Sequence, residues 1–240
     1  AELMTTRTAY LMARMLALDV QDRPVDETVE FYRSSGMHPD VLSQRMAERP
    51  FNFADIIAPL PLGFTRIQDG DLLTIGGRRW RVHTGHGHAP EHATLWSEDD
   101  AVVLGGDQFI PSISPNLGVY PTEPHADPVA DWLESCHRFQ PLAREDQLVL
   151  PGHKLPYRGL PTRLEQLIDN HVSALDRLEA HLDMPASAAE CFLPIFKRDI
   201  RPSEYGLALV EAVAHCQHLW HAGRASRERR EDGAWVYARS

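Results

Sequence analysis

Hydrophobic positions recur at helical spacing in the first part of the chain. Residues 2–20 place apolar side chains three or four positions apart, which predicts an amphipathic helix packed in the core. Two shorter helices are predicted over 25–34 and 38–48, each with a proline near its start. Residues 49–62 are rich in proline and predict a loop. The stripe of the first helix is formed by Leu3, Tyr10, Leu11, Met15 and Leu18.

Shorter apolar segments then predict a sheet. The segments 72–75 and 78–84 flank Gly76-Gly77, which is typical of a β-hairpin. Further strands are predicted over 92–96, 101–106 and 147–150. A helix is predicted over 127–139 with Asp127 as its N-cap, and a long amphipathic helix over 162–182. The stripe of the long helix comprises Leu164, Leu167, Ile168, Val172, Leu175, Leu178 and Leu182.

The end of the chain predicts a separate small unit. Residues 187–196 and 204–223 are each predicted to be helical, and a β-hairpin with its turn at Asp232-Gly233 follows. Two helices followed by a hairpin are typical of a winged-helix-like domain. We therefore predict one domain over residues 1–183 and a winged-helix-like domain over 184–240.

Composition narrows the class of protein. The 240 residues carry 24 Lys and Arg against 34 Asp and Glu, a net charge of -10, which disfavours non-specific binding to nucleic acid or to anionic lipid. The three cysteines lie far apart, which excludes a disulfide framework and favours a reducing, cytoplasmic location. No apolar run is long enough to span a bilayer, and no export signal is visible. From residue 199 onward six arginines face six acidic residues, so the tail does not have the basic character of a DNA-binding domain.

Histidines gather after the predicted hairpin. The segment HTGHGHAPEH contains His83, His86, His88 and His92, and imidazole is the commonest metal ligand in proteins. Glycines beside them let the backbone turn around an ion, although a histidine-rich surface loop has the same composition. In contrast, His171 is predicted on the polar face of the long helix. Packing and solvent contact within the tail explain His215, His218 and His221 more simply than a second metal site would.

Two other predicted strands end in residues that can bind a metal. Asp107 follows the apolar strand in LGGDQ, and His153 follows a strand in LPGHKLP. Ligand sites collect at the carboxyl ends of strands in layered α/β folds. Taken alone, Asp107 fits a turn or N-cap aspartate, and His153 fits a solvated loop histidine. The combination of three strand ends that deliver His, Asp and His favours a metal site.

This set of segments resembles the metallo-β-lactamase superfamily. GHAPEH is similar to its GHxPxH loop, LGGDQ to its (S/G)GD strand end, and LPGHKLP to its PGHxxP loop. The resemblance implies the second half of an αββα sandwich with its connecting helices. It also implies two divalent ions, zinc with iron or manganese as alternatives. His88 would bind the first metal, His153 the second, and the catalytic Asp107 would bridge them.

The resemblance is incomplete in one respect. The superfamily's HxHxDH segment, which supplies further ligands to both metals, does not occur in the chain. Because that segment lies in the family just before a helix like residues 2–20, we expect a half-sandwich of the ββα type to precede Ala1 in the full protein. If the chain instead began naturally at Ala1, it would be a catalytically inactive binding protein.

The resemblance also implies a reaction. A hydroxide generated by the metal ions would attack an ester, thioester or lactone-like small molecule. A phosphodiesterase or nuclease on the same scaffold is the alternative, and the tail is expected to pack, to mediate a homodimer or to line the substrate pocket. Lys154, Tyr157 and Arg158 are predicted to contact substrate, whereas His86 and His92 are predicted to support the metal ligands.

Overall fold

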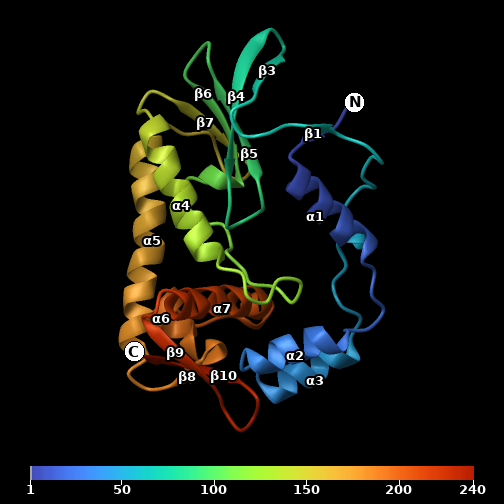
Figure 1. Cartoon of the computed structure of the whole chain (residues 1–240), viewed down its shortest axis with the longest axis vertical. Coiled ribbons are helices and arrows are strands. Elements are labelled where there is room, and N and C mark those ends of the chain that lie inside the picture. Colours follow the sequence, from blue (N-terminus) through green and yellow to red (C-terminus); the bar gives the residue numbers. More distant parts are fainter. Residues whose placement is uncertain (1) are drawn as a thin grey trace. The chain divides into compact units, whose positions relative to one another are not determined.

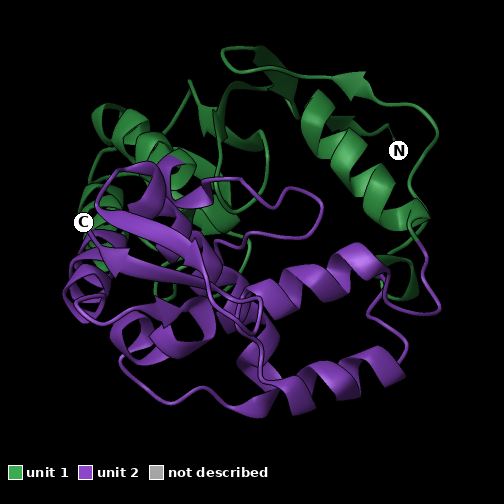
Figure 2. Cartoon of the chain, turned by 60° about the horizontal axis from the view of Figure 1, so that its bottom comes forward, with its two compact units in different colours: residues 1–19, 53–115, 131–170 green, residues 20–52, 116–130, 171–240 purple. Residues whose placement is uncertain are grey.

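The computed structural model describes residues 2–240, and the chain divides into two compact units (Figure 2). Unit 1 comprises residues up to 19, 53–115 and 131–170, and unit 2 comprises 20–52, 116–130 and 171–240. The helices α4 (Pro128–Phe139) and α5 (Leu160–His181) each run from one unit into the other. The predicted division between residues 183 and 184 stays a prediction.

A five-stranded sheet forms the centre of unit 1 (Figure 1). The strands lie in the order β3-β4-β5-β6-β7; β3 to β6 are antiparallel neighbours, and β7 is parallel to β6. Gly76 and Gly77 have φ angles of 60° and 79°, so the predicted glycine turn joins β3 to β4. The strand bounds are Leu72–Ile75, Arg78–Gly85, His92–Ser97, Val102–Gly106 and Leu148–Pro151 for β3 to β7.

Aromatic side chains join α4 to the sheet. The rings of Trp96 on β5 and Phe139 on α4 stack with centroids 6.0 Å apart, and Phe109 meets Phe139 edge-on at 4.9 Å. A hydrogen bond from the backbone N–H of His86 to the Ser135 hydroxyl, 2.9 Å, fixes the loop after β4 to the same helix. The core of unit 1 therefore holds the loops at the end of the sheet in place.

The first helix of the structure is shorter than predicted. Helix α1 spans Arg7–Leu18, because Met4–Thr5 form strand β1, which pairs in parallel with β2 (Thr65–Arg66). Tyr10 is buried: its ring stacks on Phe64 and its hydroxyl donates to the Leu62 carbonyl at 2.6 Å. The other side chains of the predicted stripe that lie on α1 are exposed, so the prediction that this stripe packs in the core was wrong. These exposed side chains are Leu11, Met15 and Leu18.

Unit 2 combines helices with a three-stranded sheet of order β8-β10-β9. Two predicted helices are confirmed as α2 (Asp26–Ser34) and α3 (Pro39–Ala47). The predicted helix over 187–196 was wrong in its first part: Ala186–Ser187 form β8, Ala188–Cys191 a 3-10 turn, and α6 covers Phe192–Phe196. The Ser187 hydroxyl and the Glu190 carboxylate form a capping box there, which stops β8 and starts the turn. Helix α7 (Tyr205–His221) and the hairpin of β9 (Ala225–Arg229) and β10 (Trp235–Arg239) complete the unit.

Within residues 2–240, no helix combines the length and the apolar character that crossing a membrane requires. The hairpin of β9 and β10 turns where the sequence predicts, with Gly233 at a φ of 85°. Two helices followed by this hairpin match the predicted order of elements, while the likeness to a winged helix stays a prediction.

Asp127 is expected to contribute to the stability of unit 2. Its carboxylate accepts from the Ala130 N–H at 3.0 Å, as the sequence predicts for an N-cap, and lies 3.0 Å from Nδ1 of His218. We expect Asp127→Ala to lower the free energy of unfolding by about 1–2 kcal/mol in urea titrations. Asp127→Asn keeps the capping oxygen and should lose less than half of that. Equal losses in the two variants would show that the cap contributes nothing.

Candidate metal centre

The strand directions bring three loops of unit 1 to one edge of the sheet. Strands β4 and β6 point the same way because β5 between them is antiparallel to both, and β7 is parallel to β6. His88 lies in the loop after β4, Asp107 directly follows β6, and His153 lies in the loop after β7. The carboxyl ends of these strands therefore deliver the three predicted ligands to the same edge.

One carboxylate oxygen is shared by the two histidines. Oδ2 of Asp107 lies 3.5 Å from Nε2 of His88 and 3.6 Å from Nε2 of His153. These separations are longer than the usual 2.7–3.2 Å of a hydrogen bond. They approach the spacing of about 3.3 Å between two ligands of one tetrahedral ion with bonds near 2.0 Å. The geometry fits a carboxylate oxygen that shares a metal with each imidazole.

Two glycines allow the loops to approach closely. A Cβ atom on Gly152 would lie 2.3 Å from Oδ1 of Asp107, and the Gly152 N–H donates to the Gly106 carbonyl at 2.8 Å. Gly106 itself has a φ of 51°, and a Cβ there would lie 2.7 Å from Cε1 of His92. In the sequence these glycines stand only as parts of motifs; in the structure each leaves room for a neighbouring polar side chain.

Buried polar atoms near Asp107 have no protein partner. Within residues 2–240, no hydrogen bond reaches Oδ1 of Asp107, Nδ1 of His92 or the side-chain amide of Gln108. Buried polar atoms are nearly always paired, and an ion or ordered water explains exceptions. Burial, reinforced by the neighbouring His88, lowers the pKa of His92, so its imidazole is neutral. The donor set of oxygen and neutral imidazole nitrogen fits a divalent ion.

Gln108 is a residue of this site that the sequence analysis missed. Its Oε1 atom lies 2.2 Å from the position that a Cβ on Gly85 would take, so the amide packs directly over the end of β4. The signal in the sequence was its place next to Asp107 in the LGGDQ segment. Gln108 belongs to the same 3-10 turn, Asp107–Phe109, that positions the carboxylate of Asp107.

Three more of the predicted site residues, Lys154, His86 and Tyr157, lie in or beside the loops that carry His88 and His153. Lys154 follows His153 and adopts a φ of 72°, which fixes a sharp turn after the histidine. His86 accepts from the Glu91 N–H through Nδ1 at 3.3 Å, so it orders the loop that carries His88. The hydroxyl of Tyr157 is buried, and burial raises its pKa above the usual value.

The structure does not place Arg158 with this group. The backbone of Tyr157 pairs in an antiparallel bridge with Val149, which turns the chain back toward the start of β7. The Arg158 guanidinium accordingly donates to the backbone carbonyl of Asp146, at the opposite end of β7 from His153. The prediction of Arg158 as a substrate contact stays a prediction, and this placement does not support it.

Comparison with known proteins identifies the family. The model of the metallo-beta-lactamase superfamily matches residues 18–180, more than half of the chain. The chain belongs to the metallo-β-lactamase superfamily. A second family model, the metallo-beta-lactamase-like C-terminal domain, matches residues 175–240. A search of curated proteins finds no match.

Two solved structures resemble this metallo-β-lactamase superfamily chain along its whole length. A beta-lactamase domain protein from Burkholderia ambifaria is 35% identical, with a TM-score of 0.88; the match covers 100% of this chain and 67% of that one. A metallo-beta-lactamase family protein from Thermus thermophilus is 24% identical, with a TM-score of 0.76, and the match covers 100% of this chain and 72% of that one. The predicted metallo-β-lactamase-like α/β fold is thereby confirmed. Members of this superfamily are generally hydrolases and typically bind divalent metals.

Proposed function

We propose that the protein is a metal-dependent hydrolase of small-molecule esters, thioesters or lactones. The observation that carries the proposal is the sharing of Asp107 Oδ2 between Nε2 of His88 and Nε2 of His153. A carboxylate in this position fits a bridge between two divalent ions. Zinc suits the donor set best, with iron or manganese as alternatives. When bound, such ions activate water and polarise the scissile carbonyl group.

The residues around Asp107 have separate roles in this proposal. His88 and His153 would each hold one ion, and the positive-φ turn at Gly106 places Asp107 where it would bind with both histidines. The neutral His92 packs on Gly106 and keeps that turn in place. Lys154, beside His153, is available to bind an anionic group of the substrate.

The hairpin of unit 2 favours a small-molecule substrate over a nucleic acid. Its arginines are engaged within the protein: Arg229 with Glu30, Arg230 with Glu190, and Arg227 between the rings of Trp220 and Trp235 at 3.7 and 4.4 Å. Phosphate binding by these side chains would require the ion pairs to open. This arrangement ranks the ester, thioester and lactone classes first.

The proposal is tested by substrate panels with the purified protein in zinc-containing buffer. We expect turnover of thioesters or lactones, its loss on chelation with EDTA, and a fall of at least about 100-fold in kcat/KM for His153→Ala. His125→Ala is the matched control, because His125 lies outside unit 1, and it should retain full activity. Cleavage of single-stranded RNA without turnover of any thioester or lactone would overturn the proposal.

A further inference from the structure

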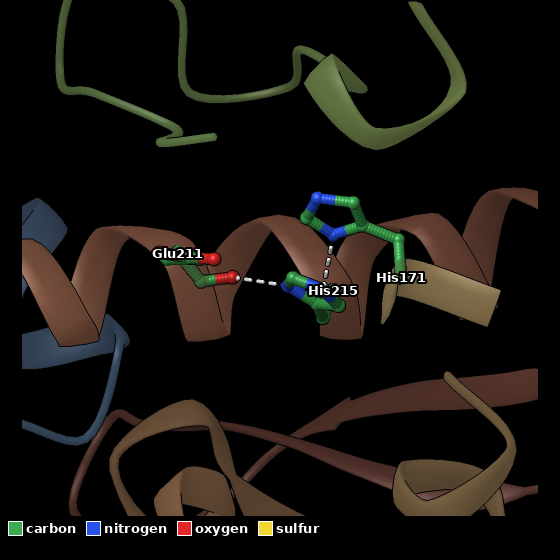
Figure 3. A group of neighbouring side chains, drawn as sticks. All are labelled: His171, Glu211 and His215. Carbon is green, nitrogen blue, oxygen red and sulfur yellow. Dashed lines mark hydrogen bonds between the residues drawn. The ribbon is translucent and has the colours of Figure 1, made fainter. Parts of the chain in front are cut away.

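A second cluster of metal-binding side chains lies in unit 2, outside the site described above. His171 on α5 and His215 on α7 have relative exposures of 0% and 1%, and Glu211 lies one helical turn before His215 (Figure 3). The prediction of His171 on a polar helix face was wrong. Helical spacing from Ile168 and Leu175 places His171 in the buried stripe, whereas the predicted stripe residue Val172 is exposed.

The ligand atoms of the cluster converge. Nδ1 of His171 lies 3.2 Å from Nε2 of His215, and one ligand atom from each of the three side chains lies within 4.8 Å of the others. Two nitrogens bound to one tetrahedral zinc ion at 2.0–2.1 Å are about 3.3 Å apart. The two imidazoles are hydrogen-bonded in the metal-free protein, and the same spacing also fits two ligands of a single ion.

A backbone hydrogen bond fixes the tautomer of His215. Nδ1 of His215 lies 2.8 Å from the backbone carbonyl oxygen of Glu211, as the dashed line in Figure 3 shows. A carbonyl oxygen only accepts, so Nδ1 carries the proton and Nε2 presents its lone pair toward His171. Metal-binding histidines in proteins are oriented in this way by a second hydrogen bond from the other ring nitrogen.

The carboxylate of Glu211 is the acidic group of the cluster and lies in a half-buried position. Asn116 donates from Nδ2 to Oε2 of Glu211 at 2.7 Å, which orients the group. Partial removal of its carboxylate from solvent raises the pKa of Glu211 to about 7, against the lowering effect of the Asn116 hydrogen bond. Burial lowers the pKa of His171 to about 3 and of His215 to about 4. A nitrogen that binds a metal must carry no proton, and the tautomer fixed by the Glu211 carbonyl leaves Nε2 of His215 in that state.

We propose that His171, Glu211 and His215 bind one divalent transition-metal ion of the zinc class. Two imidazoles and one carboxylate form a donor set that zinc uses in proteins. The ion would tie the middle of α5 to α7 inside unit 2, and the role we assign to it is structural. No residue of the candidate centre around Asp107 takes part, and the proposal does not rest on the proposed hydrolase function.

The test uses a chain in which the candidate metal centre of unit 1 has been disabled by mutation. The double variant His88→Ala/His153→Ala serves as the background, and zinc is measured by mass spectrometry after removal of the purification tag and dialysis. We expect the background chain to retain about one zinc ion per chain. Adding Glu211→Gln, which preserves shape and can still pair with Asn116, should abolish this zinc. Adding Glu204→Gln, a surface glutamate just before α7, is the matched control and should leave it in place.

Thermal unfolding gives a second readout. Zinc at about 100 times its dissociation constant should raise the Tm of the background chain by roughly 5–10 °C, and Glu211→Gln should remove this shift. A merely structural glutamate would change the Tm equally with and without zinc. A background chain that binds no zinc, or a Glu211→Gln variant that keeps its zinc, would overturn the proposal.

A measurement on the background chain alone covers the case in which core variants do not fold. With histidines labelled by nitrogen-15, zinc should change the chemical shifts of one Nδ1 and one Nε2 nitrogen, as expected for His171 and His215. Changes confined to Nε2 nitrogens, or spread over surface histidines, would contradict the assignment.

Discussion

Replacing Asp107 by asparagine is expected to lower the affinity of unit 1 for zinc by about 100-fold or more. Asparagine has the same shape but no charge, so it cannot serve as an anionic bridge between ions held by His88 and His153. The affinity is measured by competition with a chromophoric chelator in a Glu211→Gln background, where only the unit 1 site takes up zinc. Asp99→Asn is the control, because Asp99 lies in the turn between β5 and β6 and its carboxylate pairs with Arg79 at 2.6 Å instead.

The same substitution separates a ligand from a structural residue. Within residues 2–240, Oδ1 of Asp107 has no hydrogen-bond partner, so the fold loses little when the charge is removed. We expect the free energy of unfolding without metal to change by less than about 0.5 kcal/mol. Unchanged zinc affinity in Asp107→Asn would exclude the carboxylate as a ligand. A large loss of stability in the metal-free chain would assign it a structural role.

Replacing Gly106 by alanine is expected to destabilise the metal-free protein by about 2–4 kcal/mol. The φ of 51° and ψ of -142° are strained for any residue with a side chain, and the added Cβ would meet the His92 ring at 2.7 Å. To relieve both, the turn after β6 must move, and Asp107 moves with it. We therefore expect the zinc affinity of unit 1 to fall together with stability.

Gly63→Ala is the control for this second substitution. A Cβ atom added to Gly63 would have no other atom within 4 Å, and the backbone conformation there is an ordinary one. This replacement should therefore change stability by less than about 0.5 kcal/mol. Urea titrations measure both variants. A neutral Gly106→Ala variant with unchanged zinc binding would show that the turn does not position Asp107.

The three candidate ligands could be brought together from the sequence because the features that place them are local. His88, Asp107 and His153 each follow an apolar segment that forms a strand, and the strand directions then bring the three ends together. Arg158 could not be placed in this way. Its position depends on the bridge between Val149 and Tyr157, a pairing that hydrophobic spacing does not encode.

Errors elsewhere also trace to contacts between distant segments. Residues 4–5 are extended because they pair with Thr65–Arg66, although their apolar spacing favours a helix. Similarly, Ala186–Ser187 pair with β10 rather than starting a helix. The error at His171 has a different cause. Helical spacing alone places His171 in the buried stripe of α5, but only apolar residues were assigned to that stripe.

The most direct test of the metal centre is anomalous diffraction at the zinc edge from crystals of the protein grown with zinc. We expect an anomalous peak next to Oδ2 of Asp107, within about 2.0–2.2 Å of that oxygen and of Nε2 of His88 or of His153. Zinc bound elsewhere in the crystal with no peak at Asp107 would contradict it.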